Sequence, residues 1–187
     1  MIKIGITGSI ASGKTTVAKI LAGKKYPLFN ADLEVKKIYK KNIFKKKIGK
    51  KFNIQNKKNL KYEIKKIINK KKLNLKKLEK IIHPLVRKEM RSFQKRNKRK
   101  EILIFEIPLL IESKLMKNFD KIIFVNSKKK TRYKRYLRRG KNPKIFNLLD
   151  KRQFSPSRKI KLSDYVINNN FSLKVLKKNV KIIKNNL

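Results

Sequence analysis

The stretch that decides the fold lies near the start of the chain and reads Gly8-Ser9-Ile10-Ala11-Ser12-Gly13-Lys14-Thr15. It matches the phosphate-loop pattern G-x-x-x-x-G-K-[ST], in which backbone N–H groups and a helix N-terminus surround an anion. The lysine of this pattern reaches the β- and γ-phosphates, and the hydroxyl of its last residue is offered to Mg²⁺. We therefore expect residues 8–15, called the phosphate loop below, to bind a nucleoside triphosphate. The alternative is a glycine turn followed by a solvated lysine.

The segments around the phosphate loop supply the strand-to-helix context that such a loop needs. Residues 1–7 carry β-branched side chains and predict a buried strand, and residues 13–22 predict a helix with one apolar stripe. Further strands are expected at 27–30, 102–105, 122–125 and 165–167, further helices at 33–40 and 131–139, and a closing helix at 173–187. Because strands alternate with helices, the sequence predicts an α/β fold with a parallel sheet.

Composition bounds the class of protein. The 187 residues include 56 Lys and Arg against 11 Asp and Glu, a formal net charge of +45. Such a charge is typical of nucleic-acid-binding proteins. The lysines, however, are spread along the chain rather than clustered. Lys, Ile and Asn are also encoded by A- and T-rich codons, so a biased genome would give any protein this composition. With 40% hydrophobic residues the chain can bury a core, and without Cys it excludes disulfides and thiol catalysis. We expect no specific nucleic-acid partner and no membrane span.

Several nucleotide-dependent classes are excluded by missing motifs. The chain contains neither the N-K-x-D motif with which GTPases read the base nor a D-x-x-G switch, and the larger ATPases need more chain. A kinase of a small molecule remains, which needs a carboxylate near the γ-phosphate and cations that screen it. Nucleoside and nucleotide kinases stay open as alternatives, as does a basic nucleic-acid-binding protein with an inactive phosphate loop.

Two acidic residues follow predicted strands and are candidates for that carboxylate. Asp32 follows the short strand at 27–30, and Glu106 follows the apolar run 102–105. Both are expected at the carboxyl edge of the sheet, where open α/β sheets bind ligands. For Asp32 the alternative is an N-cap for the helix at 33–40, and the two roles are compatible. On the helix at 131–139, Arg132, Arg135 and Arg139 share one face and predict either a phosphate clamp or a solvated face.

Taken in order, these motifs resemble the dephospho-coenzyme A kinase family. The resemblance runs from residue 2 to about residue 169 and is most specific after the phosphate loop. Its elements are Asn30-Ala31-Asp32, the run Leu78-Glu79-Lys80-Ile81-Ile82-His83-Pro84, the run Glu106-Ile107-Pro108-Leu109-Leu110-Ile111-Glu112, the spacing of Arg135, Arg139, Phe146 and Gln153, and the run Ser163-Asp164-Tyr165-Val166-Ile167-Asn168-Asn169.

The resemblance implies a P-loop kinase with a three-layer fold, a helical substrate-binding insertion and a helical lid. The single kinase domain would have its core at 1–40 and 101–187, a coenzyme A-binding insertion at about 41–100 and a lid at about 128–158. It would move the γ-phosphoryl group of ATP to the ribose 3′-hydroxyl of dephospho-coenzyme A in the cytoplasm. ATP would be held by Gly8, Ala11, Ser12, Gly13, Lys14, Thr15 and Thr16, with Thr15 on Mg²⁺.

The family's pattern also assigns roles outside the phosphate loop. Asp32 matches the family's proposed base, and Lys14 and Arg139 would screen the transferred phosphoryl group. The substrate would meet His83, Pro84, Glu106, Pro108, Leu109 and Arg135. For His83 a purely structural role before a proline stays open.

Three positions depart from the family's pattern. Asn30 replaces an Asp and cannot act as a carboxylate, so Asp32 is left as the candidate base of this motif. Glu106 replaces an Asp and has one more methylene group. Ala11 replaces a glycine of the loop, which we expect to be tolerated only if its φ is negative.

Overall fold

The structure, a computed structural model, describes residues 1–54, 59–70 and 72–187 of the chain. Its described residues form two units, one of residues 1–30 and 97–187 and the other of residues 31–96. Residues 55–58 and 71, which belong to the expected insertion, lie outside the described residues. Within the described part of the chain, no helix has the length and apolar character needed to span a bilayer.

The first unit is built on a parallel sheet. Among the described residues the strands are β1 (Ile2–Gly8), β2 (Leu28–Asn30), β3 (Ile102–Glu106), β4 (Lys121–Asn126) and β5 (Tyr165–Asn168), in the order β2-β3-β1-β4-β5. Every pair is parallel. The five strands expected from the sequence, and the α/β class, are thereby confirmed.

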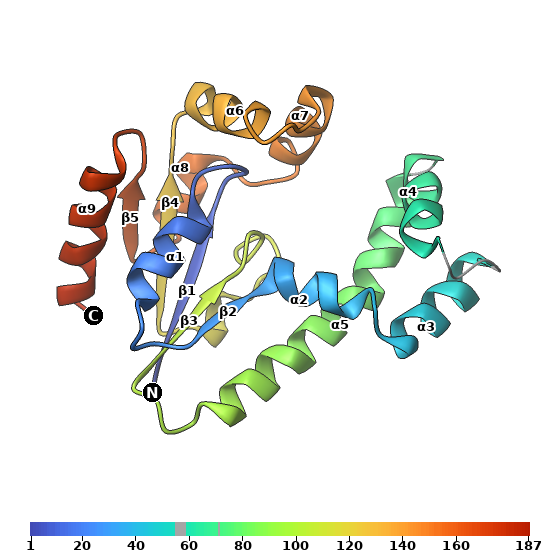
Figure 1. Cartoon of the computed structure of the whole chain (residues 1–187), viewed down its shortest axis with the longest axis horizontal. Helices are drawn as coiled ribbons and strands as arrows, with labels where there is room; N and C mark the ends of the chain where they lie inside the picture. Colours follow the sequence, from blue (N-terminus) through green and yellow to red (C-terminus); the bar gives the residue numbers. More distant parts are fainter. Residues whose placement is uncertain (55–58, 71) are drawn as a thin grey trace. The chain divides into compact units, whose positions relative to one another are not determined.

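Side-chain alternation along β1 explains how the two faces of the sheet are covered. Ile4 and Ile6 are fully buried and pack with residues of α1 (Lys14–Ala22) and α9 (Leu173–Asn185), which lie side by side in Figure 1. Gly5 faces the opposite way, and a Cβ there would lie 2.5 Å from Leu110 Cδ1, so glycine lets the segment after β3 approach. The short 3₁₀ helix η1 (Met116–Asn118) belongs to that segment.

A segment of three helices follows β4 and is called the α6–α8 segment below. It comprises α6 (Lys129–Leu137), α7 (Pro143–Asp150) and α8 (Pro156–Lys161). Asn142 and Ser155 cap α7 and α8, and each is followed by a proline in the first turn, the favoured start of a helix. Phe146 of α7 is fully buried and packs edge-on against Tyr133 and Tyr136 of α6.

The second unit is helical and has a core of its own. It contains α2 (Ala31–Ile38), α3 (Asn42–Phe52), α4 (Leu60–Lys70) and α5 (Lys72–Arg96). Its buried side chains are Ile38, Phe44, Ile48, Ile54, Leu60, Ile64, Leu78 and Ile82. The described lysines of these helices are exposed or half-buried, as is typical of the polar faces of amphipathic helices.

The parallel sheet brings the polar ends of its strands to one edge. β1 ends at Gly8 and leads into the phosphate loop, β3 ends at Glu106, and β5 ends at Asn168. The register pairs Asn30 and Ile6 with Glu106. Asp32 follows Asn30 by two residues and lies in the first turn of α2. Within the first unit, the phosphate loop, Asn30 and Glu106 therefore lie at the edge where open α/β sheets bind ligands.

Candidate active site

The phosphate loop needs its two glycines for space. A Cβ on Gly8 would lie 2.6 Å from the Val125 carbonyl oxygen, and one on Gly13 would lie 2.2 Å from Asn169 Nδ2. Gly13 also has φ +95°, in the left-handed region that favours glycine. Side chains at these positions would displace the start of α1, whose N-cap is Gly13.

Ala11 differs from the sequence-based expectation. Its φ is +58°, although the sequence predicted that alanine would be tolerated here only at negative φ. A left-handed non-glycine residue costs about 1–3 kcal/mol. The buried methyl group of Ala11 packs in a cluster with Tyr136 and Phe146 of the α6–α8 segment. This packing offsets part of the strain, which explains why alanine occupies the position.

Lys14 and Ser12 both turn toward the inside of the loop. Lys14 is buried and its Nζ donates to the Ser9 carbonyl oxygen at 3.0 Å. The Ser12 N–H donates to the same carbonyl oxygen at 3.1 Å, and within the described residues its buried Oγ has no hydrogen-bond partner. Ser12 therefore shapes the turn, while Lys14 places a cation within the phosphate loop.

Thr15 and Glu106 join the start of α1 to the end of β3. The Thr15 hydroxyl donates to Glu106 Oε1 at 2.6 Å, and Asn30 Nδ2 donates to Glu106 Oε2. Glu106 is only 2% exposed. Asn30, which the sequence marked as a departure from the family's pattern, thus supplies a donor where an aspartate would bring a second negative charge beside this carboxylate.

The same pair is the candidate metal position. Mg²⁺ is held in nucleotide sites by one or two protein oxygens together with phosphates and waters. A threonine hydroxyl and one carboxylate beside a phosphate loop fit that requirement. The described residues contain no cluster of three or more His, Cys, Asp or Glu that could hold a metal by itself.

A small cavity opens beside the N-terminus of α1. Its volume is about 160 Å³, and its lining residues are Gly13, Thr16, Arg135, Arg139, Asn169, Phe171, Leu173 and Leu176. Burial, and secondarily the neighbouring Arg139, lowers the pKa of Arg135, but a guanidinium stays charged in proteins. Phe171 is 69% exposed, so a large aromatic surface stands open beside two cations. A planar ring attached to phosphates suits such a cavity.

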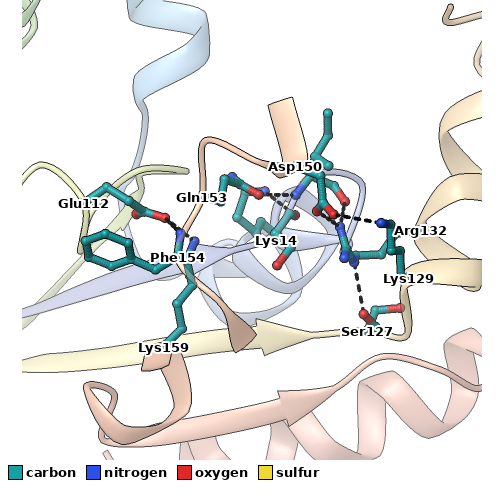
Figure 2. A network of polar contacts seen from close by, with 11 residues as sticks. Lys14, Glu112, Ser127, Lys129, Arg132, Asp150, Gln153, Phe154 and Lys159 are labelled. Carbon is teal, nitrogen blue, oxygen red and sulfur yellow. Dashed lines mark hydrogen bonds and ion pairs between the residues drawn. The ribbon is translucent and has the colours of Figure 1, made fainter. Parts of the chain in front are cut away.

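Arg132 neither joins Arg135 and Arg139 in a phosphate clamp nor lies on a solvated face, the two alternatives that the spacing of the three residues left open. It is only 3% exposed. Its guanidinium bonds to Asp150 Oδ1 at 2.6 Å and to the carbonyl oxygens of Ser127 at 3.1 Å and Ile10 at 3.4 Å. These contacts are drawn in Figure 2, and they make Arg132 a structural tie between α6, α7 and the phosphate loop.

A family model described as dephospho-CoA kinase matches residues 2–174. The chain belongs to the dephospho-CoA kinase family. A dephospho-CoA kinase of Fusobacterium nucleatum is 37% identical over 182 residues, which cover 95% of this chain and 94% of that protein. One from Rickettsia typhi is 33% identical, with 99% and 97% covered.

Solved structures show the same fold. TT1252 from Thermus thermophilus has a TM-score of 0.80 at 27% identity, covering 100% of this chain and 97% of the other. A dephospho-CoA kinase from Campylobacter jejuni has a TM-score of 0.66 at 24% identity, with 98% and 96% covered. A shikimate kinase from Bacteroides thetaiotaomicron, at 14% identity and a TM-score of 0.57, shares the P-loop kinase fold and carries no information on substrate.

The remaining residues singled out by the family's pattern lie in both units. Asp32, His83 and Pro84 belong to the second unit, where Asp32 is exposed in the first turn of α2 and half-buried His83 precedes Pro84 within α5. Because α2 begins at Ala31, Asp32 is not the N-cap that its position before residue 33 had allowed. Pro108 and Leu109 are half-buried in the first unit, and the Pro108 carbonyl oxygen accepts from the Thr7 hydroxyl at 3.0 Å.

Three residues at the site were not assigned a role from the sequence. Asn169 Nδ2 donates to the Ser12 carbonyl oxygen at 2.8 Å, and the Asn169 carbonyl oxygen accepts from Arg135 at 2.9 Å. Gln153 accepts from the Ile10 N–H. The position of Asn169, directly after the last strand, was the available signal. For Gln153 the signal was its place in the spacing that resembles the family's lid, although no role was assigned to it. For Phe171 the sequence alone carried no signal.

Proposed function

We propose that this chain transfers the γ-phosphoryl group of ATP to the ribose 3′-hydroxyl of dephospho-CoA and so produces CoA. The observation that carries the proposal is the phosphate loop, with Lys14 buried inside it and Thr15 bonded to Glu106, in a chain of the dephospho-CoA kinase family. Phosphoryl transfer asks the protein mainly for positioning and for positive charge around the γ-phosphate.

ATP is expected to bind entirely within the first unit. Its phosphates would lie on the phosphate loop, where Lys14 carries the charge nearest to the β- and γ-phosphates. Its base would enter the cavity beside Gly13 and Thr16 and stack on Phe171. Arg135 and Arg139 line the same cavity, and Arg139 is exposed in the turn after α6, so its guanidinium can turn toward the phosphoryl group that is transferred.

Mg²⁺ would be held by the Thr15 hydroxyl and the Glu106 carboxylate together with phosphate oxygens. When bound, the ion neutralises charge on the β- and γ-phosphates. Asn30 keeps the Glu106 carboxylate oriented through its own donor. The protein's contribution here is to hold one hydroxyl and one carboxylate at the helix end of the phosphate loop.

Asp32 is our candidate for the base that accepts the proton of the ribose hydroxyl. It lies two residues after Asn30, the last residue of β2, and Asn30 is in register with Glu106. Asp32 is exposed in the first turn of α2, so its carboxylate is accessible to a substrate hydroxyl. A carboxylate that follows a strand of the sheet so closely in the sequence is the type of group that this role requires.

The helical insertion at about 41–100 is proposed to bind the rest of dephospho-CoA, with contributions from His83 and Pro84. A cavity of about 660 Å³ in the second unit is lined by Ile81 and by four lysines of α3, Lys46, Lys47, Lys50 and Lys51. Cations beside an apolar surface suit a substrate that combines a diphosphate with a long, partly apolar arm. In the first unit, Glu106, Pro108, Leu109 and Arg135 would meet the same substrate.

The experiment that tests this proposal is a phosphorylation assay with a panel of acceptors. Purified protein, ATP and Mg²⁺ are mixed separately with dephospho-CoA, a nucleoside, a nucleoside monophosphate and shikimate, and product is identified by mass. We expect phosphorylation of dephospho-CoA alone. Activity on the other acceptors without activity on dephospho-CoA would contradict the proposal.

A further inference from the structure

The backbone of Ile10, in the middle of the phosphate loop, is held from both sides by the α6–α8 segment. Its N–H donates to Gln153 Oε1 at 2.8 Å, and its carbonyl oxygen accepts from Arg132 Nη1 at 3.4 Å. Gln153 lies between α7 and α8, 143 positions further along the chain. A segment that is remote in sequence therefore fixes one peptide unit of the loop that is expected to bind phosphate.

The residue that follows this peptide is the strained one. Ala11 has φ +58°, a conformation that an alanine leaves readily unless its surroundings hold it. If Ala11 relaxed toward negative φ, the backbone from Ala11 to Lys14 would turn, and with it the N–H groups that a phosphate loop presents to its ligand. The hydrogen bonds on Ile10 act immediately before this point.

Gln153 is itself well anchored, as Figure 2 shows. The N–H of the next residue, Phe154, donates to Glu112 Oε1 at 2.9 Å, and Lys159 Nζ lies 2.8 Å from the same oxygen. Lys159 has no exposed surface. A buried ion pair of this kind resists displacement because separating it would leave charges in an apolar interior.

Arg132 is anchored in the same way on the other side, through its 2.6 Å contact with Asp150. Gln153 and Arg132, the two residues that bond to the Ile10 backbone, therefore both lie in parts of the α6–α8 segment that ion pairs hold in place. Any small shift of Gln153 would be passed directly to the peptide before Ala11.

We propose that Gln153 is a positioning residue for ATP binding, which holds the Ile10–Ala11 turn of the phosphate loop in its strained, ligand-ready form. The side-chain oxygen of Gln153 accepts from the Ile10 N–H, so Gln153 would influence ATP binding through the backbone of the loop. A neutral amide suits this task better than a carboxylate, because a negative charge there would oppose the triphosphate. The inference rests on the proposed function only in that ATP is taken as the ligand of the loop.

The test measures ATP affinity by calorimetry without any second substrate. Gln153→Ala removes the acceptor and leaves the Ile10 N–H unpaired, so we expect about tenfold weaker ATP binding. Gln153→Met keeps the volume, should show the same loss, and serves if the alanine variant fails to fold. Lys151→Ala, an exposed residue two positions earlier, is the control and should bind ATP like the unaltered protein.

A second substitution separates positioning from a general loss of structure. Ala11→Gly removes the strain, so it should restore most of the affinity for ATP that Gln153→Ala loses. If Gln153 only supported the fold, Gln153→Ala would lower the urea midpoint of unfolding without weakening ATP binding. Ala11→Gly would then restore no affinity for ATP.

The proposal is overturned if both Gln153 variants bind ATP as the unaltered protein does, if both fail to fold, or if Ala11→Gly has the same effect in both backgrounds. Absence of ATP binding in the unaltered protein would refute the proposed function as well. A chain that binds ATP but does not phosphorylate dephospho-CoA would refute the proposed function alone.

Discussion

The Thr15 hydroxyl donates a 2.6 Å hydrogen bond to Glu106 Oε1, and this bond links the first turn of α1 to the end of β3. It places the hydroxyl of the phosphate loop beside a carboxylate that is almost fully buried. A buried carboxylate is costly unless donors or cations compensate it. Thr15 and Asn30 supply two donors, and the proposed Mg²⁺ would supply the cation.

Glu106→Gln is therefore expected to lower kcat about 10- to 100-fold, the usual loss when a group that orients a metal site is removed. The amide keeps the shape but loses the charge, so the Mg²⁺ concentration at half-maximal rate should rise in parallel. The control is Glu101→Gln, an exposed residue before β3 whose 3.3 Å pair with Lys25 lies at the surface. An unchanged Mg²⁺ dependence in Glu106→Gln would remove Glu106 from the metal position.

Asp32→Asn should lower kcat by about 10²–10⁴, the range for loss of a general base, with ATP affinity nearly unchanged. Steady-state kinetics and calorimetry with ATP measure the two effects separately. Glu34→Gln is a matched control, because Glu34 lies in the same first turn of α2 and bonds to Lys37 at 2.6 Å. Full activity in Asp32→Asn would refute the role of base for Asp32.

Phe171→Trp offers a direct probe of the cavity beside Gly13, since the chain contains no other tryptophan. If the base of ATP stacks on this side chain, ATP should quench the indole fluorescence and inorganic triphosphate should not. Phe171→Ala should weaken ATP binding by about 5- to 100-fold, because stacking contributes about 1–3 kcal/mol.

Ile182→Trp is the control for this experiment, since Ile182 is exposed on α9 and does not line the cavity. Its fluorescence should not respond to ATP. Equal quenching of Phe171→Trp by ATP and by triphosphate would show that the base lies elsewhere.

The buried pair of Lys159 and Glu112 should dominate the stability of the α6–α8 segment. Lys159→Met leaves the Glu112 carboxylate buried without its cation, so the free energy of unfolding is expected to fall by about 3–5 kcal/mol. Replacing both residues, as Lys159→Met with Glu112→Leu, should recover most of the loss. A single variant as stable in urea as the unaltered protein would contradict the burial of this pair.

The same lysine predicts a dependence on pH. Burial is the largest influence on Lys159 and lowers its pKa below the ordinary 10.5, although the Glu112 hydrogen bond and charge work in the opposite direction. Between the lowered pKa and 10.5 the unfolded chain binds more protons at this position than the folded chain does. The stability of the unaltered protein relative to Lys159→Met should therefore increase as pH rises through that window, as urea unfolding at a series of pH values would show.

Much of the core could be predicted from the sequence because its signals are local. The phosphate loop, the apolar strands and their alternation with helices specify a parallel sheet whose carboxyl edge carries Lys14, Thr15 and Glu106. The positions of Asp32 and Arg139 were singled out by the strand and helix patterns and given roles by the family's pattern, which alone added His83, and all three roles stay predictions.

What the sequence could not supply were contacts between distant segments. Arg132 shares a helix face with Arg135 by spacing, yet it turns inward to Asp150 and Ile10, because a periodicity does not say which neighbour a face meets. Lys159 is fully buried in a chain where lysine is common, and nothing in its local sequence marks it. The surroundings of Ala11, whose φ is positive, likewise include the aromatic cluster and the Gln153 bond to Ile10, and both come from the α6–α8 segment.

The most direct test of the central claim is to follow the label from ATP radiolabelled at its γ-phosphoryl group, with dephospho-CoA as the acceptor. The label is expected in a product that co-migrates with CoA, and a 3′-nucleotidase should release it as inorganic phosphate. Lys14→Ala should transfer at least about 10²-fold less label, since it removes a charge from the transferring group. Label that a 3′-nucleotidase cannot remove, or no label in CoA while ATP binds normally, would contradict the account.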